Sequence, residues 1–182
     1  TVGSLLSCKG ADETTIFIAL DGPLSEKACD KQKLIKKYIS TIEGFKSVEL
    51  FERGENYGAL KNSKAARDEI LVVETGGLFI FSPYFLSYMN SGLDYFKYDK
   101  SIFSICGYLE PIIAGAEHAF LRQGFTSNGF GIWKEKYLNM ESSQLSIKDE
   151  DLSFLNFNKM IKAMGYHVVS GMIYSEKMDY KL

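Results

Sequence analysis

Apolar residues in the first half of the chain alternate between two spacings. Short runs of apolar residues predict strands at 15–20, 78–81 and 101–106, and the alternation of polar and apolar residues predicts another at 47–52. Between these runs, apolar residues recur every three or four positions, which predicts helices over 25–44, over 59–74 and from 82 onward. This alternation of strands and helices predicts an α/β fold with a mostly parallel central sheet flanked by helices.

Capping residues mark the ends of these helices. Ser25 can cap the first helix and Gly44 can end it, whereas Ser82-Pro83 is a typical helix start. The first helix is predicted to bury the apolar residues Leu34, Ile35, Tyr38, Ile39 and Ile42. The helix after Ser82 is predicted to bury Phe85, Met89, Leu93 and Phe96.

The pattern weakens beyond Gly107. A short strand near 119–121 is predicted there, followed by helices over 132–138 and 152–164. Of the 182 residues, 46% are hydrophobic, which allows a substantial core, and nothing in the pattern requires a second domain. We therefore predict a single domain over residues 1–182.

Composition excludes several classes of protein. The net charge is −2 with acidic and basic residues interspersed, so no nucleic-acid partner is predicted. Cys8, Cys29 and Cys106 form no CxxC pair, which argues against a disulfide framework or a zinc site and favours a reducing, cytoplasmic setting. No apolar run approaches the about 20 residues of a membrane span, so no transmembrane segment is predicted.

Two loops at the predicted carboxyl edge of the sheet are candidate binding sites, because parallel sheets bind ligands there. The first follows a strand and contains Asp21 and Gly22, where a carboxylate can accept hydrogen bonds from a nucleobase or ribose. The second lies before a helix, whose N-terminus favours phosphate, and contributes Asn56, Gly58, Lys61 and Asn62. Asp-Gly-Pro and Asn-x-Gly are also ordinary turn sequences, so a structural role stays open for both loops.

A third candidate lies in 126–133, where two glycines stand beside Phe130 and the only tryptophan, Trp133. Such a segment can hold its backbone close to a flat ligand such as a sugar ring. The alternative is that Trp133 fills the core. No acidic residue has a partner at a telling spacing, and Glu74 is predicted to lie late in a helix, so no catalytic residue is assigned.

Five segments form an ordered set across residues 1–137. They are Ile-Glu-Gly-Phe-Lys-Ser-Val at 42–48, Glu-Arg-x-Glu-Asn-x-Gly at 52–58, Leu-Lys-Asn at 60–62, Ser-Pro-Tyr-Phe-Leu-Ser-Tyr-Met-Asn at 82–90 and Ile-Phe-Ser-Ile-Cys-Gly-Tyr at 102–108. Together they resemble bacterial relatives of N-acetylglucosaminyltransferase I. The resemblance implies a GT-A fold, a Rossmann-like nucleotide-sugar transferase architecture.

The resemblance also implies an activity and its partners. A sugar would pass from a nucleotide donor, commonly UDP-linked, to a glycan or lipid-linked acceptor in polysaccharide biosynthesis, with a divalent metal, Mn or Mg, as cofactor. Asp21 matches an aspartate near the nucleoside, and the residues of 56–62 match the turn and helix beside the nucleotide. A segment lining the donor and acceptor cleft is matched by Ser127, Gly129, Phe130 and Trp133. The expected location is the cytoplasm, with the inner membrane surface as an alternative.

Three features depart from the pattern of these relatives. The relatives begin with a strand and a loop that contacts the nucleotide, and this sequence is predicted to start after both. The Glu-Asp-Asp element that holds the metal is absent, since Phe81 takes the glutamate's place and Ser82 follows directly. No catalytic base is assigned after Trp133. Because such a metal neutralises charge on the leaving diphosphate, we keep a second hypothesis, a degenerate homologue that binds nucleotide, glycan or a protein partner without turnover.

Overall fold

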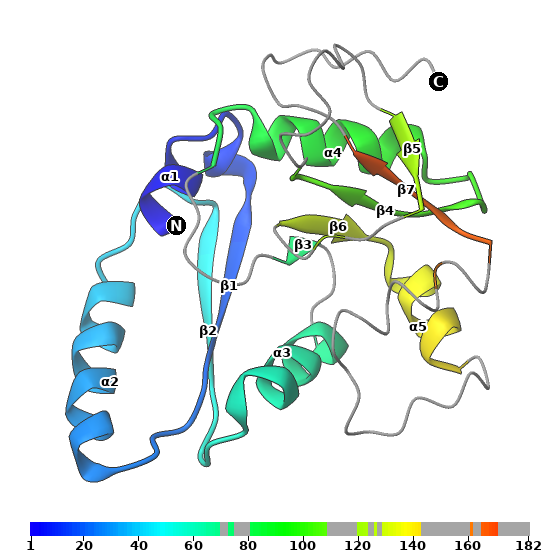
Figure 1. Ribbon diagram of the computed structural model, residues 1–182. Coiled ribbons are helices and arrows are strands. Elements are labelled where there is room, and N and C mark those ends of the chain that lie inside the picture. Colours follow the sequence, from blue (N-terminus) through cyan, green and yellow to red (C-terminus); the bar gives the residue numbers. More distant parts are fainter. Residues whose placement is uncertain are drawn as a thin grey trace. The chain divides into compact units, whose positions relative to one another are not determined.

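The computed structural model describes residues 1–69, 73–74, 81–108, 120–123, 126, 129–142, 161 and 165–170. The chain divides into two compact units, one of residues 10–70 and one that joins 1–9 to 71–182. Both units combine helices and strands, so the α/β class is confirmed (Figure 1). The single domain over 1–182 without its first strand stays a prediction.

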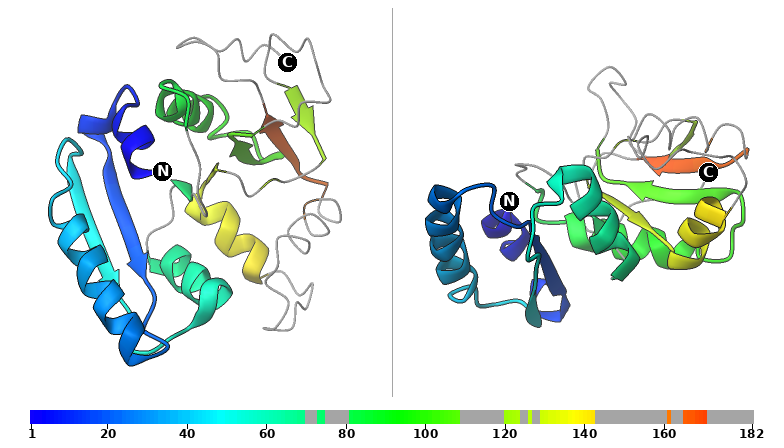
Figure 2. Two further views of the ribbon diagram at one scale, coloured as in Figure 1. Left: turned by 60° about the vertical axis from the view of Figure 1, so that its left-hand side comes forward. Right: turned by 90° about the horizontal axis from the view of Figure 1, so that it is seen from below.

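The unit of residues 10–70 is built on two parallel strands, β1 (Thr15–Leu20) and β2 (Ser47–Glu52). Both strands have the predicted bounds, because residues 15–20 are an apolar run, residues 47–52 alternate between polar and apolar, and a turn follows each. A short 3-10 helix, η1 (Ala11–Glu13), precedes β1. The helices α2 (Glu26–Ile39) and α3 (Gly58–Glu69) lie on opposite sides of the strand pair (Figures 1 and 2).

Helix α2 begins as predicted but ends early. The hydroxyl of Ser25 accepts a hydrogen bond from the backbone N–H of Ala28 at 3.3 Å, which confirms the predicted cap. The helix ends at Ile39 rather than at Gly44, and Gly44 takes a φ of 100° in the connection to β2.

The predicted buried face of α2 is largely wrong. Leu34, Ile35 and Tyr38 are 69%, 43% and 56% exposed, and among the residues of this helix Ile39 is buried. A sheet of two strands is narrow and offers little surface to cover a whole helical face. Helical spacing predicted the helix correctly, but it did not show how little would pack against it.

The other unit contains a five-stranded sheet in the order β3–β6–β4–β7–β5. Its strands are β3 (Val73–Glu74), β4 (Ile102–Cys106), β5 (Phe120–Arg122), β6 (Phe130–Ile132) and β7 (His167–Ser170). The β4–β7 pair is parallel, whereas β3–β6, β4–β6 and β5–β7 are antiparallel. The prediction of a mostly parallel sheet is therefore wrong for this unit. Strands of three residues are too short to show a period from which their pairing follows.

Strand β4 lies at the centre of this unit's core, with all five of its residues buried. Helix α4 (Phe85–Tyr95) packs close to it, since a Cβ added to Gly92 would lie 3.1 Å from the side chain of Ile105. Helix α5 (Lys134–Ser142) supplies Tyr137 to a second part of the core. There it joins Phe103, Cys106, Phe130, Ile132, Ile161 and Val168.

The predicted buried face of α4 is confirmed for Phe85, Met89 and Phe96, whereas Leu93 is half-buried. The helix begins at Phe85 rather than Ser82. The hydroxyl of Ser82 instead accepts a hydrogen bond from the backbone N–H of Tyr84 at 3.3 Å, which forms a turn ahead of the helix.

Other predictions have mixed outcomes. Glu74 belongs to β3 and not to a helix, because α3 ends at Glu69. The short helix α1 (Val2–Leu6) was not predicted. Two predicted elements lie almost entirely outside the described residues. They are the strand at 78–81, of which Phe81 is described, and the helix at 152–164, of which Ile161 is described. No helix in the described part of the chain has the length and apolarity to cross a membrane.

Candidate functional site

The two predicted loops of residues 10–70 lie together at the carboxyl edge of β1 and β2. Asp21 follows β1, and its carboxylate accepts three backbone hydrogen bonds. Oδ1 accepts from Gly22 at 3.0 Å and from Tyr57 at 2.7 Å, and Oδ2 accepts from Gly58 at 2.8 Å. Hydrogen bonds to an ionised carboxylate are among the strong ones in proteins. Asp21 therefore ties the end of β1 to the first turn of α3.

The N-terminus of α3 thus already has a carboxylate beside it. Backbone N–H groups at a helix start attract anions, and those of Tyr57 and Gly58 donate to Asp21. A carboxylate offers about four lone-pair sites, so about one remains on Asp21 for a ligand hydroxyl or amide. Asp21 therefore has a structural role, which its three backbone hydrogen bonds show, and keeps an acceptor position with which it could also bind a ligand.

Gly22 and Asn56 hold the same two loops in close contact. The side-chain amide of Asn56 donates to the carbonyl oxygen of Gly22 at 2.7 Å. A Cβ added to Gly22 would lie 2.2 Å from the carbonyl carbon of Glu55, so the approach requires glycine. Gly58 has a φ of 74°, a left-handed conformation that glycine adopts without strain.

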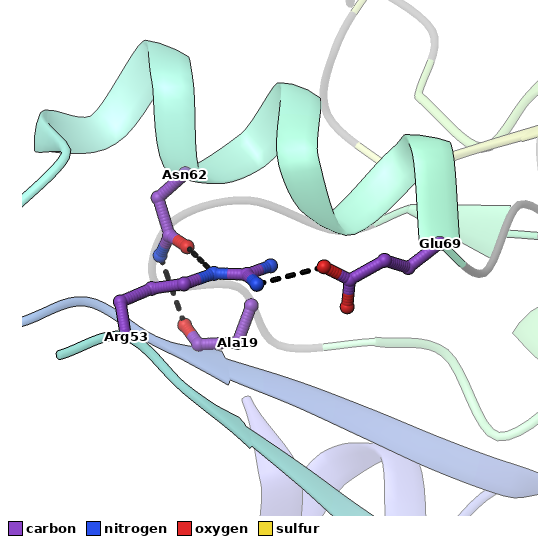
Figure 3. Close-up of polar contacts among 4 residues, drawn as sticks. All are labelled: Ala19, Arg53, Asn62 and Glu69. Atoms are coloured by element: carbon purple, nitrogen blue, oxygen red, sulfur yellow. Dashed lines mark hydrogen bonds and ion pairs between the residues drawn. The ribbon is translucent and has the colours of Figure 1, made fainter.

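Asn62 lies next to these loops, but both atoms of its side-chain amide already form hydrogen bonds within the chain. Its Nδ2 donates to the carbonyl oxygen of Ala19 at 3.2 Å, and its Oδ1 accepts from Nε of Arg53 at 3.1 Å. Arg53 continues to Glu69 through Nη1 at 2.7 Å (Figure 3). The network joins the ends of β1 and β2 to the second turn of α3, through Asn62, and to its last residue, Glu69. Asn62 is 8% exposed and bonded through both amide atoms, so its role in the site is structural.

Two cations share the ring of Tyr57. Nζ of Lys61 lies 4.0 Å from the ring centre, and Cζ of Arg53 lies 5.8 Å from it. Glu69 pairs with Arg53, whereas in the described part of the chain no carboxylate pairs with Lys61. The exposed Lys61 ammonium is therefore available to an anion at this edge. Arg53, which follows β2, connects this ring to the side chains of Asn62 and Glu69.

The predicted cleft segment belongs to the other unit. Phe130 lies in β6 and is 1% exposed. Gly129 has a φ of 75°, and a Cβ added there would lie 3.1 Å from the ring of Phe85. Ser127 lies outside the described residues. The packing supports the core interpretation for Phe130, and a role in lining a donor or acceptor cleft stays a prediction.

The Trp133 side chain also contacts other residues of this unit. Its indole Nε1 donates to the carbonyl oxygen of Leu93 at 3.2 Å, and Nζ of Lys136 lies 3.8 Å from its ring centre. That ammonium also donates to the carbonyl oxygens of Asp99 and Ile102, at 2.6 and 2.5 Å. Burial lowers the pKa of Lys136. These contacts hold the start of α5 against α4 and against the start of β4, and the Lys136 ammonium lies over the Trp133 ring.

Replacing Trp133 with phenylalanine is expected to lower the free energy of unfolding by about 1 kcal/mol, because the Leu93 carbonyl loses its donor. Urea denaturation followed by circular dichroism measures this change. Tyr98→Phe is the control, since Tyr98 is 85% exposed. A W133F protein as stable as wild type that no longer binds a nucleotide-sugar would contradict the structural role and favour the cleft role.

The predicted divalent metal has no ligand set in the part of the chain that the structure describes. Among those residues, no group of three or more His, Cys, Asp or Glu side chains could hold a metal ion. The metal, Mn or Mg, therefore stays a prediction from the resemblance, and no chemical step is assigned to it.

Comparison with protein-family models, with curated proteins and with solved structures gave no match for this chain. Function is therefore inferred from the residues and their geometry.

Proposed function

We propose that this chain belongs to a nucleotide-sugar-dependent glycosyltransferase of GT-A-like architecture, which moves a sugar, commonly UDP-linked, to a glycan or lipid-linked acceptor. The donor nucleotide would bind at the carboxyl edge of β1 and β2, where ligands of α/β sheets bind. One observation carries the proposal: the Asp21 carboxylate, which three backbone N–H groups hold at this edge, keeps about one acceptor position free. A cytoplasmic location is part of the proposal.

Each residue of this edge has a role in the proposed site. Asp21 would accept a hydrogen bond from the nucleoside, and Lys61 would meet the diphosphate. Gly22, Asn56 and Gly58 keep the two loops in contact, so the acceptor and the cation stay in place. Transfer would be a direct displacement at the anomeric carbon, in which positioning of the donor and charge stabilisation of the leaving diphosphate lower the barrier.

A second candidate is a homologue that binds nucleotide, glycan or a protein partner without turnover. The direct Phe81–Ser82 junction favours it, because it leaves no acidic pair at that point of the sequence. Hydrolysis of UDP-GlcNAc in the presence of manganese separates the two candidates. Sugar release above the rate without protein supports the transferase, whereas tight binding without release supports the homologue.

Calorimetric titration with UDP and UDP-GlcNAc, each with and without manganese, is expected to show binding of both. Tighter binding with manganese would indicate an acidic metal site outside the described residues. Equal binding without the metal would indicate that cationic side chains bind the diphosphate. Failure of both ligands to bind under every condition would contradict the proposed site. Where variants of this site are titrated, Lys33→Gln is the control for loss of a positive charge, since Lys33 lies on the exposed side of α2 and pairs with Asp30 at 2.9 Å.

A further inference from the structure

We propose that Arg53 contacts the phosphate groups of the bound nucleotide, and that Asn62 and Glu69 orient it for this contact. The inference rests on the proposed nucleotide site and names the group within it that recognises the diphosphate. Asn62, a predicted nucleotide ligand, becomes a positioning residue.

The donors of the Arg53 guanidinium show how it is held. The group is planar and carries five N–H donors in a fixed fork. Nε donates to Asn62 at 3.1 Å and Nη1 donates to Glu69 at 2.7 Å (Figure 3). Nη2 is buried and has no hydrogen-bond partner within the described residues. Two of the three nitrogens therefore fix the orientation of the fork, and the third keeps its donors unused.

An unused, buried N–H group of a charged side chain is unfavourable, because it has lost water without gaining an acceptor. The Arg53 side chain is only 12% exposed, so water compensates little. Phosphate oxygens could accept hydrogen bonds from these unused donors, since guanidinium groups bind phosphate through parallel N–H donors. The ligand would supply the acceptor that the protein does not.

The local charge favours the same ligand. Lys61 and Arg53 approach one ring, that of Tyr57, and within the described residues Glu69 is the carboxylate that pairs with either of them. Two cations near one ring repel each other, and a diphosphate between them would relieve this repulsion. Because Nη2 is buried, some of the groups that cover it are expected to shift when the nucleotide binds.

The test compares UDP with uridine, which lacks the phosphates. Affinities of wild type, Arg53→Gln and Arg53→Lys are measured by calorimetry for UDP and by chemical-shift titration for uridine. We expect R53Q to lower the affinity for UDP by about tenfold or more and to leave that for uridine unchanged. R53K keeps the charge without the fork and is expected to recover part of the loss. The control K33Q removes one positive charge from an exposed site in the same unit and should change neither affinity.

The outcomes separate this inference from the proposed function. If wild type binds UDP and R53Q binds it equally well, the role of Arg53 is wrong and the nucleotide site stands. An equal loss of UDP and uridine affinity in R53Q and R53K would show a purely structural role and would also overturn the inference. If wild type binds neither ligand, both the proposed function and the inference fail.

Discussion

Replacing Asp21 with alanine is expected to lower the free energy of unfolding of the 10–70 unit by about 3 kcal/mol and to abolish nucleotide binding. Three backbone N–H groups lose their acceptor together, and hydrogen bonds to a charged group contribute about 1.5–3 kcal/mol each when counted singly. We expect less than their sum, because Asp21 is half-buried and water can reach part of the loop. Amide hydrogen exchange is the sharpest measurement, since Tyr57 and Gly58 should lose protection first.

Two matched variants test the explanation for Asp21. Asp21→Asn keeps one acceptor oxygen but sets an NH₂ group against a backbone donor, so we expect an intermediate loss of stability. Asp30→Asn removes an exposed carboxylate that pairs with Lys33 and should cost about 0.5 kcal/mol or less. Unchanged exchange at Tyr57 and Gly58 in D21A would contradict the structural role. Unchanged UDP affinity in D21A would contradict the proposed nucleotide contact.

The parts of this site that could be predicted from sequence are those set by local pattern. Residues 15–20 are an apolar run and residues 47–52 alternate between polar and apolar. A turn follows each segment, and both strands have the predicted bounds. Parallel neighbouring strands end at the same edge, so the meeting of the Asp21 and Asn56 loops followed from the strand prediction. The α3 start at Gly58 was predicted to within one residue, because Asn-x-Gly turns precede helices in this way.

The roles of individual side chains could not be predicted, because they depend on partners far away in sequence. Nothing near Asn62 in the sequence shows that Ala19 and Arg53 would use both of its amide atoms. The exposure of Leu34 depends on how wide a surface the strands offer, which helical spacing does not contain. Within the candidate segment 126–133, residues 130–132 form strand β6, which is too short for its sequence pattern to show that it pairs in a sheet.

Replacing Gly22 with alanine is expected to lower the free energy of unfolding of the same unit by about 3 kcal/mol, the upper part of the usual range for overpacking. The new Cβ would lie 2.2 and 2.3 Å from the carbonyl carbon and oxygen of Glu55, and 2.7 Å from the backbone nitrogen of Asn56. These are main-chain atoms, so no side-chain rotation can relieve the overlap and the loops must separate. Urea denaturation followed by circular dichroism measures the change in stability.

Separation of the loops should also weaken nucleotide binding. It would break the hydrogen bond from Asn56 to the Gly22 carbonyl and move the backbone donors of Asp21 away from its carboxylate. Gly54→Ala is the matched control, because Gly54 lies in the β2–α3 connection that Gly22 approaches, and an added Cβ there meets no atom within 4 Å. We expect G54A to change stability by about 0.5 kcal/mol or less. Equal stability and equal UDP affinity of G22A and G54A would show that the two loops do not meet as described, and the proposed site would lose its basis.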